Sequence, residues 1–422
     1  ATINSSNPFV TWSFDSKTGV LSQDLVPEPL VVLEQEINDP EAIANVLLFT
    51  PELQQDVLNI AANDGGVAAN ESVTRLVNSD AIALVAAPVN LAVQDTTQVI
   101  SNRAEKISQP LQIITADAGG ETGISAGETH YDKYGAWISP YYGVGTQKSR
   151  STQPGYKSTY YGGVFGFDSL INDTTAIGVA FSTMKTDVKH KDINLGDRTK
   201  VDTYVVSVYG TYELTKKWFV QSVATIGRSK IKNRELRQEF GATRIASANY
   251  KATSWGIEAL TGYNHMLRKD LVVTPLMGFE YNRLNSFKYR ETGTQLQNLR
   301  VNQKANNQLE AIVGARIASV LQLKDNRFKN FTFLPDLTIL PEIHGNIRYQ
   351  VLNKKLNTRI RQDVDGGQDL TPRHDKQVRM VYNVGVGIKA THDRWEYSAG
   401  YDLRLAKKYI GHQGALTLKV HF

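Results

Sequence analysis

The longest polar segment of the sequence, NKKLNTRIRQDVDGGQDLTPRHDK (353–376), is the one place where acidic side chains gather around a histidine. It contains Asp365, Asp369, His374 and Asp375. A histidine beside carboxylates can move protons in general acid–base catalysis. The segment supplies no defined nucleophile, and the chain of 422 residues contains no cysteine. An enzyme with this group at its surface therefore stays an alternative, and we predict no catalytic residue.

Metal and cofactor chemistry find equally little support. The eight histidines are scattered, and none belongs to an HExxH or HxH pattern that would bring two ligands to one ion. Gly143-Val144-Gly145 and Gly385-Val386-Gly387 lie inside extended segments, without the strand–turn–helix context of a nucleotide-binding loop. The net charge of +5 is too small to indicate nucleic acid. We expect no metal, no cofactor and no nucleic-acid partner.

Charged residues recur in the second half of the chain at positions that have a structural meaning. In WEYSAGYDLRL (395–405), apolar or aromatic residues occupy every odd position, and charged residues, Ser or Gly occupy the even ones. This period of two is typical of a β-strand with two different faces. The same alternation recurs after residue 130, and we predict that the charges on the polar faces line one lumen: Glu258, Glu280, Glu310, Arg316, Glu342, Arg379, Glu396, Asp402 and Arg404.

The alternating segments are long, and aromatic residues gather near their ends. Strands of soluble sandwiches usually hold about five or six residues, whereas a strand that crosses a membrane needs about 9–11. Terminal aromatics are typical of membrane interfaces. The pattern favours a transmembrane antiparallel β-barrel over a soluble sandwich. About twelve strands are predicted, near 133–148, 157–171, 175–191, 200–214, 218–233, 247–267, 271–287, 305–323, 331–351, 376–391, 395–408 and 412–422.

The connections between these segments alternate in length. Short ones such as 172–174 and 392–394 alternate with long ones such as 233–247, 288–304 and 353–376. The seven residues KDNRFKN form a slightly longer turn on the short side. Outer-membrane barrels place short turns in the periplasm and long loops outside. An even number of strands then leaves both ends of the barrel in the periplasm.

Before residue 130 the sequence has a helical pattern. We predict one helix over 41–64 and a longer helical stretch from Glu71, which Pro88 must interrupt. The uninterrupted part from Val89 to Gln109 would be roughly 31 Å long, about the thickness of a bilayer core. It is too polar to face lipid but suits a polar lumen. Before these helices, TWSFDSKTGVL indicates a strand rung with a turn at Lys17-Thr18-Gly19.

Together these features resemble the translocator domain of autotransporters (type V secretion). HYDKYGAWISPYYGVGTQK and the ending HQGALTLKVHF are similar to the rickettsial surface cell antigen and outer-membrane autotransporters. The resemblance implies an outer-membrane barrel that anchors and exports an N-terminal passenger. It divides the chain into a passenger remnant or junction (1–80, at the cell surface), a pore helix with linker (81–130) and the barrel (131–422). The chain, which begins at Ala1 without a signal peptide, would be part of a longer protein.

The resemblance also assigns roles to residues. The pore helix would present Val89, Val93, Thr97, Ile100, Asn102, Arg103 and Glu105 to the lumen. Arg103 and Glu105 could pair there with Glu258, Glu280, Arg316, Asp402 or Arg404, unless these charges only line a solvated pore. The terminal aromatic of the family is read by the barrel-assembly machinery, and the matching residues are Leu416, Leu418, Val420 and Phe422. Some members cleave themselves at paired asparagines of the helix; here Arg103 follows Asn102, which departs from that motif.

The implied partners are the assembly machinery, the passenger, outer-membrane lipid or lipopolysaccharide and, through the passenger, a host-cell surface. We expect a monomer. Basic residues of the long connections, such as Lys185, Lys200 and Arg234, could contact anionic lipid, or they could simply be solvated. The alternatives are an adhesin or porin that acts through its loops, and a barrel enzyme.

Overall fold

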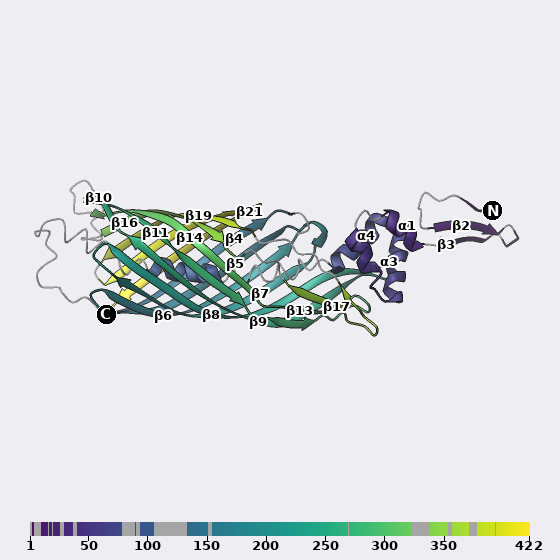
Figure 1. Cartoon of the computed structure of the whole chain (residues 1–422), viewed down its shortest axis with the longest axis horizontal. Coiled ribbons are helices and arrows are strands. Elements are labelled where there is room, and N and C mark those ends of the chain that lie inside the picture. The colour runs from purple at the N-terminus through teal and green to yellow at the C-terminus, as the bar shows by residue number, and fades with distance from the viewer. Residues whose placement is uncertain are drawn as a thin grey trace, which may run out of the picture.

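Figure 1 shows an elongated molecule in which a β-barrel carries a group of short helices at one mouth and a narrow hairpin beyond them. None of the described helices is both long enough and apolar enough to cross a bilayer. The computed structural model describes the chain except for residues 1, 4–9, 16, 19, 26–28, 37–39, 78–88, 90–92, 105–132, 151–153, 269, 323–337, 353–356, 371–377 and 393.

Twelve long antiparallel strands form the barrel wall, as the alternation predicts. Two short strands, β10 (His265–Arg268) and β15 (Leu321–Gln322), pair with the wall at one end. The twelve are β4 (Tyr134–Gln147), β5 (Tyr156–Asn172), β6 (Thr175–His190), β7 (Arg198–Glu213), β8 (Trp218–Glu239), β9 (Ala242–Tyr263), β11 (Leu271–Leu284), β14 (Asn306–Ser319), β16 (Thr338–Gln350), β19 (Met380–His392), β20 (Trp395–Ala406) and β21 (Tyr409–His421).

The wall closes without a free edge. Strand β21 pairs with β4 and β9 pairs with β11, so each strand of the wall has two neighbours. At the seam the backbone N–H of Phe422 donates to the carbonyl of Tyr134 at 3.0 Å, and that of Tyr134 donates to Phe422 at 3.1 Å. Closure matters because lipid offers no partner to an unpaired backbone group.

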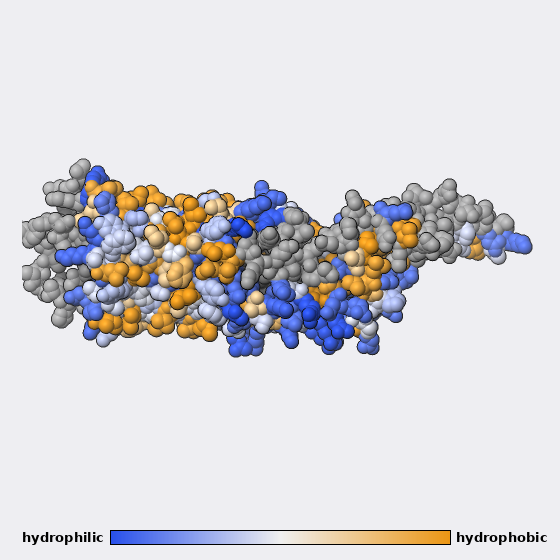
Figure 2. Space-filling view, viewed as in Figure 1, coloured by the Kyte–Doolittle hydropathy of each residue, from blue (hydrophilic) through white to orange (hydrophobic). Residues whose placement is uncertain are grey.

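The pleat turns alternate side chains outward and inward. In β6, Ile177, Val179 and Phe181 are exposed, whereas Ala176 and Ala180 are buried. Exposed apolar residues of this kind form a broad band across the face of the barrel seen in Figure 2. An apolar surface of this extent requires an apolar environment. Exposed aromatics border the band, with Tyr142, Tyr161, Tyr204 and Trp255 on the side of the helices and Tyr134, Trp218, Trp395 and Phe422 at the other end.

The hairpin β8–β9 extends far beyond this band. Each of its strands has 22 residues, and they join through Phe240 and Gly241, which both have positive φ, as a type I′ turn requires. The prediction of a long loop over 233–247 is therefore wrong. The period of two continues through Glu239, and the backbone stays paired along the whole hairpin.

Two other expected loops also contain strands. The segments around 288–304 and 353–376 contribute to a small four-stranded sheet of β12 (Phe287–Arg290), β13 (Leu299–Gln303), β17 (Thr358–Gln362) and β18 (Asp369–Leu370). These strands have only two to five residues, too few for a period to be recognised in the sequence.

The N-terminal region folds into a small three-stranded sheet and four short helices. The predicted turn after Asp15 is present, and the Asp15 carboxylate accepts a hydrogen bond from the backbone of Lys17 at 2.9 Å. The helix predicted over 41–64 is divided, because Pro51 forces Thr50 into an extended conformation and starts a new helix. The elements are β1 (Thr2–Ile3), β2 (Val10–Asp15), β3 (Val20–Leu25), α1 (Pro29–Glu36), α2 (Pro40–Val46), α3 (Pro51–Asp64) and α4 (Gly66–Val77).

The helices share one hydrophobic core with the extended loops. Leu53 and Val57 of α3 belong to the same buried cluster as Tyr250 of β9, Tyr289 of β12 and Ile360 of β17. We call this assembly of α2–α4, the outer end of β8–β9 and the four-stranded sheet the outer cap. Polar contacts join its parts, since Asp56 accepts from the backbone of Phe240 at 2.8 Å and Thr50 bonds Gln362. Arg75 of α4 also pairs at 2.8 Å with Asp197 in the connection before β7.

Candidate functional site

A helix inside the barrel is the feature around which the lumen is organised. Residues 93–104 are helical, and their partners lie on strands from around the wall. Of the predicted pore-helix residues, Val89, Val93, Thr97, Ile100 and Arg103 are buried and Asn102 is half-buried. Glu105 lies outside the described residues.

Arg103 is held between two strands. Its Nη1 lies 2.7 Å from Glu396 on β20, and its Nε lies 3.2 Å from Asp168 on β5. Lys419 pairs with Asp168 at 2.7 Å, and Lys389 pairs with Glu396 at 3.2 Å. This arginine clamp is buried, which makes it costly to break.

The clamp differs from the expected pairing. The partners proposed for Arg103 and Glu105 together were Glu258, Glu280, Arg316, Asp402 or Arg404, whereas in the described part of the chain Arg103 pairs with Asp168 and Glu396. Asp168 was not among the predicted lumen residues. Its alternation with Phe165 and Phe167 places it on the polar face of its strand, and this signal could have identified it.

A second set of contacts holds the first turns of the helix. Arg404 pairs with Asp95 at 3.0 Å and donates to Gln98 at 3.4 Å, while Gln98 donates to Asp402 at 3.2 Å. Farther around the wall, Gln221 donates to the hydroxyl of Ser101 at 2.6 Å. The helix is therefore fixed to opposite sides of the lumen.

Three predicted lumen glutamates form one row across neighbouring strands. Glu280 is directly opposite Glu258 on one side and Glu310 on the other. The guanidinium of Arg348 contacts all three, at 3.2 Å from Glu258, 3.5 Å from Glu310 and in closest contact with Glu280. Arg348 was missed by the sequence analysis, although it too lies on the polar face of its strand. One guanidinium thus serves three carboxylates.

The remaining predicted lumen residues separate into two groups. Arg316 is buried, and Glu342, Asp402 and Arg404 are half-buried toward the interior. Arg379 is exposed, and assigning it to the lumen is wrong. It precedes β19, above the part of the wall where the alternation is enforced, and it donates to the hydroxyl of Tyr349 on the outer face.

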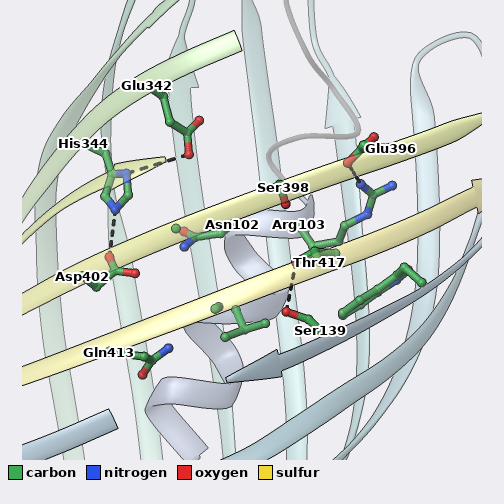
Figure 3. Close-up of a pocket in the computed structure, with 14 residues that line it drawn as sticks. Asn102, Arg103, Ser139, Glu342, His344, Glu396, Ser398, Asp402, Gln413 and Thr417 are labelled. Carbon is green, nitrogen blue, oxygen red and sulfur yellow. Dashed lines mark hydrogen bonds and ion pairs between the residues drawn. The ribbon is translucent and has the colours of Figure 1, made fainter. Parts of the chain in front are cut away.

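A cavity of about 40 Å³ lies between the helix and the wall. Figure 3 shows Asn102 extending from the helix on the side of His344 and Asp402, whereas Arg103 extends the other way, toward Glu396. The Nε2 of His344 lies 2.8 Å from Asp402, and its Nδ1 lies 4.0 Å from Glu342. The volume suffices for one or a few water molecules, so this cavity combines an asparagine with carboxylates and a histidine.

The acid–histidine group of the longest loop does not converge in the described residues. Asp365 is exposed, and Asp369 pairs at 3.8 Å with Arg359. His374 and Asp375 lie outside the described residues. Within the described part of the chain, no group of three or more His, Asp or Glu side chains is arranged to hold a metal ion.

The predicted assembly signal lies on the last strand. Leu416, Leu418 and Phe422 are exposed to the outside and Val420 is half-buried. The ring of Phe422 contacts Phe167 and Tyr134. The intervening residues point inward, where Thr417 donates to Ser139 and Lys419 joins the arginine clamp.

The outer cap buries an ionisable cluster beyond the apolar band. Arg237 pairs with Glu235 at 2.5 Å and lies 3.6 Å from Glu291. Burial raises the pKa of Glu291 to about 8 and that of Asp197 to about 6. Burial also lowers the pKa of His190. Burial opposes ionisation of Glu235 as well, but Arg237 outweighs it and holds the pKa of this carboxyl below its ordinary value.

Comparison with known proteins identifies the barrel. The family described as Autotransporter beta-domain matches residues 136–402. Outer membrane protein A of Rickettsia conorii is 30% identical over 449 aligned positions, covering 100% of this chain and 21% of that protein. Outer membrane protein B of Rickettsia prowazekii is 32% identical over 78% of this chain and 20% of its own length. The chain thus spans about a fifth of these relatives.

A solved structure supports the same fold. The translocator domain of autotransporter NalP from Neisseria meningitidis superimposes with a TM-score of 0.54, covering 80% of this chain and 100% of that domain, at 15% identity. Such a low identity supports the fold alone. With the family match over most of the barrel, the conclusion is that this chain belongs to the autotransporter family and carries its β-domain.

Proposed function

We propose that the chain is an outer-membrane translocator whose lumen is occupied by the segment that follows an exported passenger. Residues 1–80 then lie at the cell surface, 81–130 pass through the lumen and 131–422 form the barrel. One observation carries the proposal: the helix 93–104 is joined to opposite walls of the lumen, by the arginine clamp and Arg404 on one side and by Gln221 of β8 on the other. A segment held in this way connects the outside to the barrel and closes the pore.

The proposed partners follow from this placement. The passenger is upstream sequence of the same polypeptide, which extends to the outside through the outer cap. The barrel-assembly machinery would recognise the last strand through Phe422, and outer-membrane lipid would surround the apolar band. Contact with a host cell would occur through the passenger. The barrel would act as a monomer and not as an enzyme on external substrates.

Channel recordings test the translocator proposal. The purified barrel is inserted into planar bilayers with and without residues 81–117. We expect a low conductance for the full chain and a large, steady conductance after deletion, because deletion removes the helix from the pore. Equal conductance of the two proteins would contradict the proposal, and a full chain that already conducts freely would favour a porin.

The cavity beside Asn102 favours a second, more specific function, cleavage of the helix by its own asparagine. The side-chain nitrogen of Asn102 would attack the backbone carbonyl carbon of the same residue and form a succinimide, while the peptide bond to Arg103 breaks. A carboxylate of the cavity would accept the proton from the amide, and the nitrogen of Arg103 would receive one as it leaves. The proposal rests on the shared cavity of Asn102, Asp402 and Glu342.

Intact-mass analysis of the folded protein over several days tests this step. We expect fragments that end at Asn102 and begin at Arg103, and none from an Asn102→Gln variant, whose longer side chain forms the ring poorly. An Asn90→Gln variant is the matched control. A wild-type protein that stays intact would end the cleavage proposal and leave the translocator proposal untouched.

A further inference from the structure

The outer surface of β5–β9 carries a dense group of basic residues just above the apolar band. Among the residues that the structure describes on this face, two are acidic, Asp187 and Asp202, and both are half-buried. We call this surface the basic wall. Its exposed members are Lys157, Lys185, Lys189, Arg198, Lys200, Arg228, Lys230, Lys232, Arg234 and Lys251.

Strand register places several of these charges directly opposite one another. Lys230 faces Lys251 on the neighbouring strand. Lys200 faces Lys232, and Arg198 faces Arg234. Like charges directly opposite in a sheet are destabilising. The two acidic residues offset part of this charge, because Asp187 pairs with Arg198 and is opposite Lys200, and Asp202 is opposite Lys230 and Lys185. Ten basic residues against two acidic ones leave an excess of positive charge that an external anion would offset.

The height of the basic wall indicates which anion fits. Arg228 is opposite Tyr204, a member of the aromatic border, and Lys230 lies over the Tyr204 ring at 5.6 Å. The next outward position of β8 toward the band is the exposed Ile226, about 7 Å away along a strand. Charged groups therefore begin within one outward position of the lipid-facing surface. Figure 2 shows the same transition from apolar to hydrophilic surface toward the cap.

We propose that the basic wall binds the phosphate groups of a phosphorylated glycolipid in the outer leaflet of the membrane. Lys230 and Lys251 would hold a phosphate between them, with Arg228 below them at the level of the sugar. The acyl chains would lie against the exposed Phe181, Val206 and Ile226. This inference rests on the outer-membrane orientation given above but not on passenger export or on the helix in the lumen.

The position of the patch favours a lipid over a soluble polyanion. A soluble polyanion would use the charges but not the apolar surface directly below them. The lipid uses both, and its headgroup lies at the height of the aromatic border. The opposite wall, formed by β14, β16 and β19, carries mainly apolar side chains outward up to Tyr349 and Met380. Next to the apolar band the positive charge is therefore concentrated on β5–β9 and does not form a uniform ring.

Binding of bisphosphorylated lipid A to the full chain in detergent micelles tests the proposal. Titration is followed by the shift in thermal unfolding midpoint. The double variant Lys230→Gln/Lys251→Gln should bind about thirtyfold more weakly than wild type. Without lipid, the same variant should unfold close to the wild-type temperature, because it loses the like-charge contact between Lys230 and Lys251 together with the opposite-charge contact between Lys230 and Asp202. Arg379→Gln/Lys407→Gln removes two exposed charges elsewhere and should bind normally.

Three results would overturn the proposal. Equal weakening in both double variants would mean that only net charge matters. Binding of dephosphorylated lipid A as tight as that of the bisphosphorylated form would exclude phosphate recognition. Binding of dextran sulfate with the same sensitivity to Lys230 and Lys251, without any effect of lipid A, would assign the wall to a soluble polyanion. None of these results would alter the channel recordings that test the translocator.

Discussion

Replacing Arg103 by glutamine tests whether the clamp holds the helix in the lumen. The Arg103 side chain is 4% exposed and contacts two carboxylates, Glu396 at 2.7 Å and Asp168 at 3.2 Å. Glutamine keeps most of the length of the side chain and can still donate a hydrogen bond. The substitution therefore removes the charge and the fork of the guanidinium with little change in volume.

The free-energy cost of Arg103→Gln depends on which partners the two carboxylates keep. Removing one partner of a buried ion pair costs about 3–5 kcal/mol, because the other charge stays buried without compensation. Here each carboxylate keeps a lysine, since Asp168 retains Lys419 and Glu396 retains Lys389. We therefore take the lower value of about 3 kcal/mol, which is a factor of about 150 in the equilibrium between a seated and an unseated helix.

Single-channel recordings measure this equilibrium directly as the fraction of time in which the pore conducts. For Arg103→Gln we expect the open fraction to increase about 100-fold. The matched control is Gln94→Ala, which removes a neutral donor at 3.4 Å from Glu310. Such a contact contributes about 1 kcal/mol, so the control should change the open fraction less than about tenfold.

One result would refute the reasoning about the clamp. If the pore of the Arg103→Gln variant is closed for as large a fraction of the time as that of the wild type, the clamp does not hold the helix. Resistance of the variant to heat in detergent would show that its barrel is intact. Arg103→Lys separates charge from geometry: a lysine cannot reach both carboxylates with one planar group. An intermediate open fraction is expected for it.

Three further predictions concern the wall, the outer cap and the last strand. Gly166→Ala should lower the free energy of unfolding in urea titrations by about 1–3 kcal/mol, because the new Cβ would lie 2.3 Å from the Trp137 ring. In the control Gly163→Ala, the nearest atom to the new Cβ is 3.8 Å away, so the free energy of unfolding should not change. The free energy of unfolding of the outer cap should fall by about 1–2 kcal/mol between pH 6.5 and 8, because Glu291, with its pKa near 8, binds a proton only in the folded cap. Spectroscopic labels on α4 and β8 should therefore separate at a lower urea concentration at pH 8 than at pH 6.5. The Glu291→Gln variant should remove this difference. A short polar tail after Phe422 should reduce barrel assembly in cells but not refolding into detergent, and equal loss in both assays would contradict a separate recognition role.

The barrel could be predicted because the bilayer imposes a simple rule on the sequence. A strand that faces lipid on one side and a polar lumen on the other must alternate, and it must be long enough to cross. The predicted ends of β4, β6 and β20 differ from the observed ones by two residues or fewer. The last strand was equally clear, because its alternation continues to Phe422.

The pairing inside the lumen could not be predicted. The alternation tells which face a residue occupies but not its height or its neighbour across the pore. Glu258, Glu280 and Glu310 meet in one row only because of the register of three strands. Arg103 reaches Asp168 and Glu396 because the seam between β4 and β21 brings β5 and β20 near each other. Register and closure are properties of the whole wall, not of a single segment.

The position of the membrane boundary, in contrast, could be predicted from the sequence, because the polarity pattern changes along one strand. In the lower part of β9 the outward residue is Ile257 and the inward residue is Glu258, whereas nearer the outer cap the outward residues are Asn249 and Lys251 and the inward one is Tyr250. The strand keeps its period of two, but its apolar face moves from outside to inside. Lipid contacts the outer face below this point, and water contacts it above.

This reversal explains why the outer cap and the basic wall occur together. Above the membrane, inward apolar residues such as Ile231 and Tyr250 require a covering, which the helices and the four-stranded sheet provide. The outward face of the same strands, no longer in contact with lipid, can carry charge. A hydrophobic core above the band and a cationic surface around it are thus two consequences of extending β8 and β9 beyond the bilayer. In other barrel sequences, such extensions could be found by searching for the point in a strand where the apolar residues change from the outward to the inward positions.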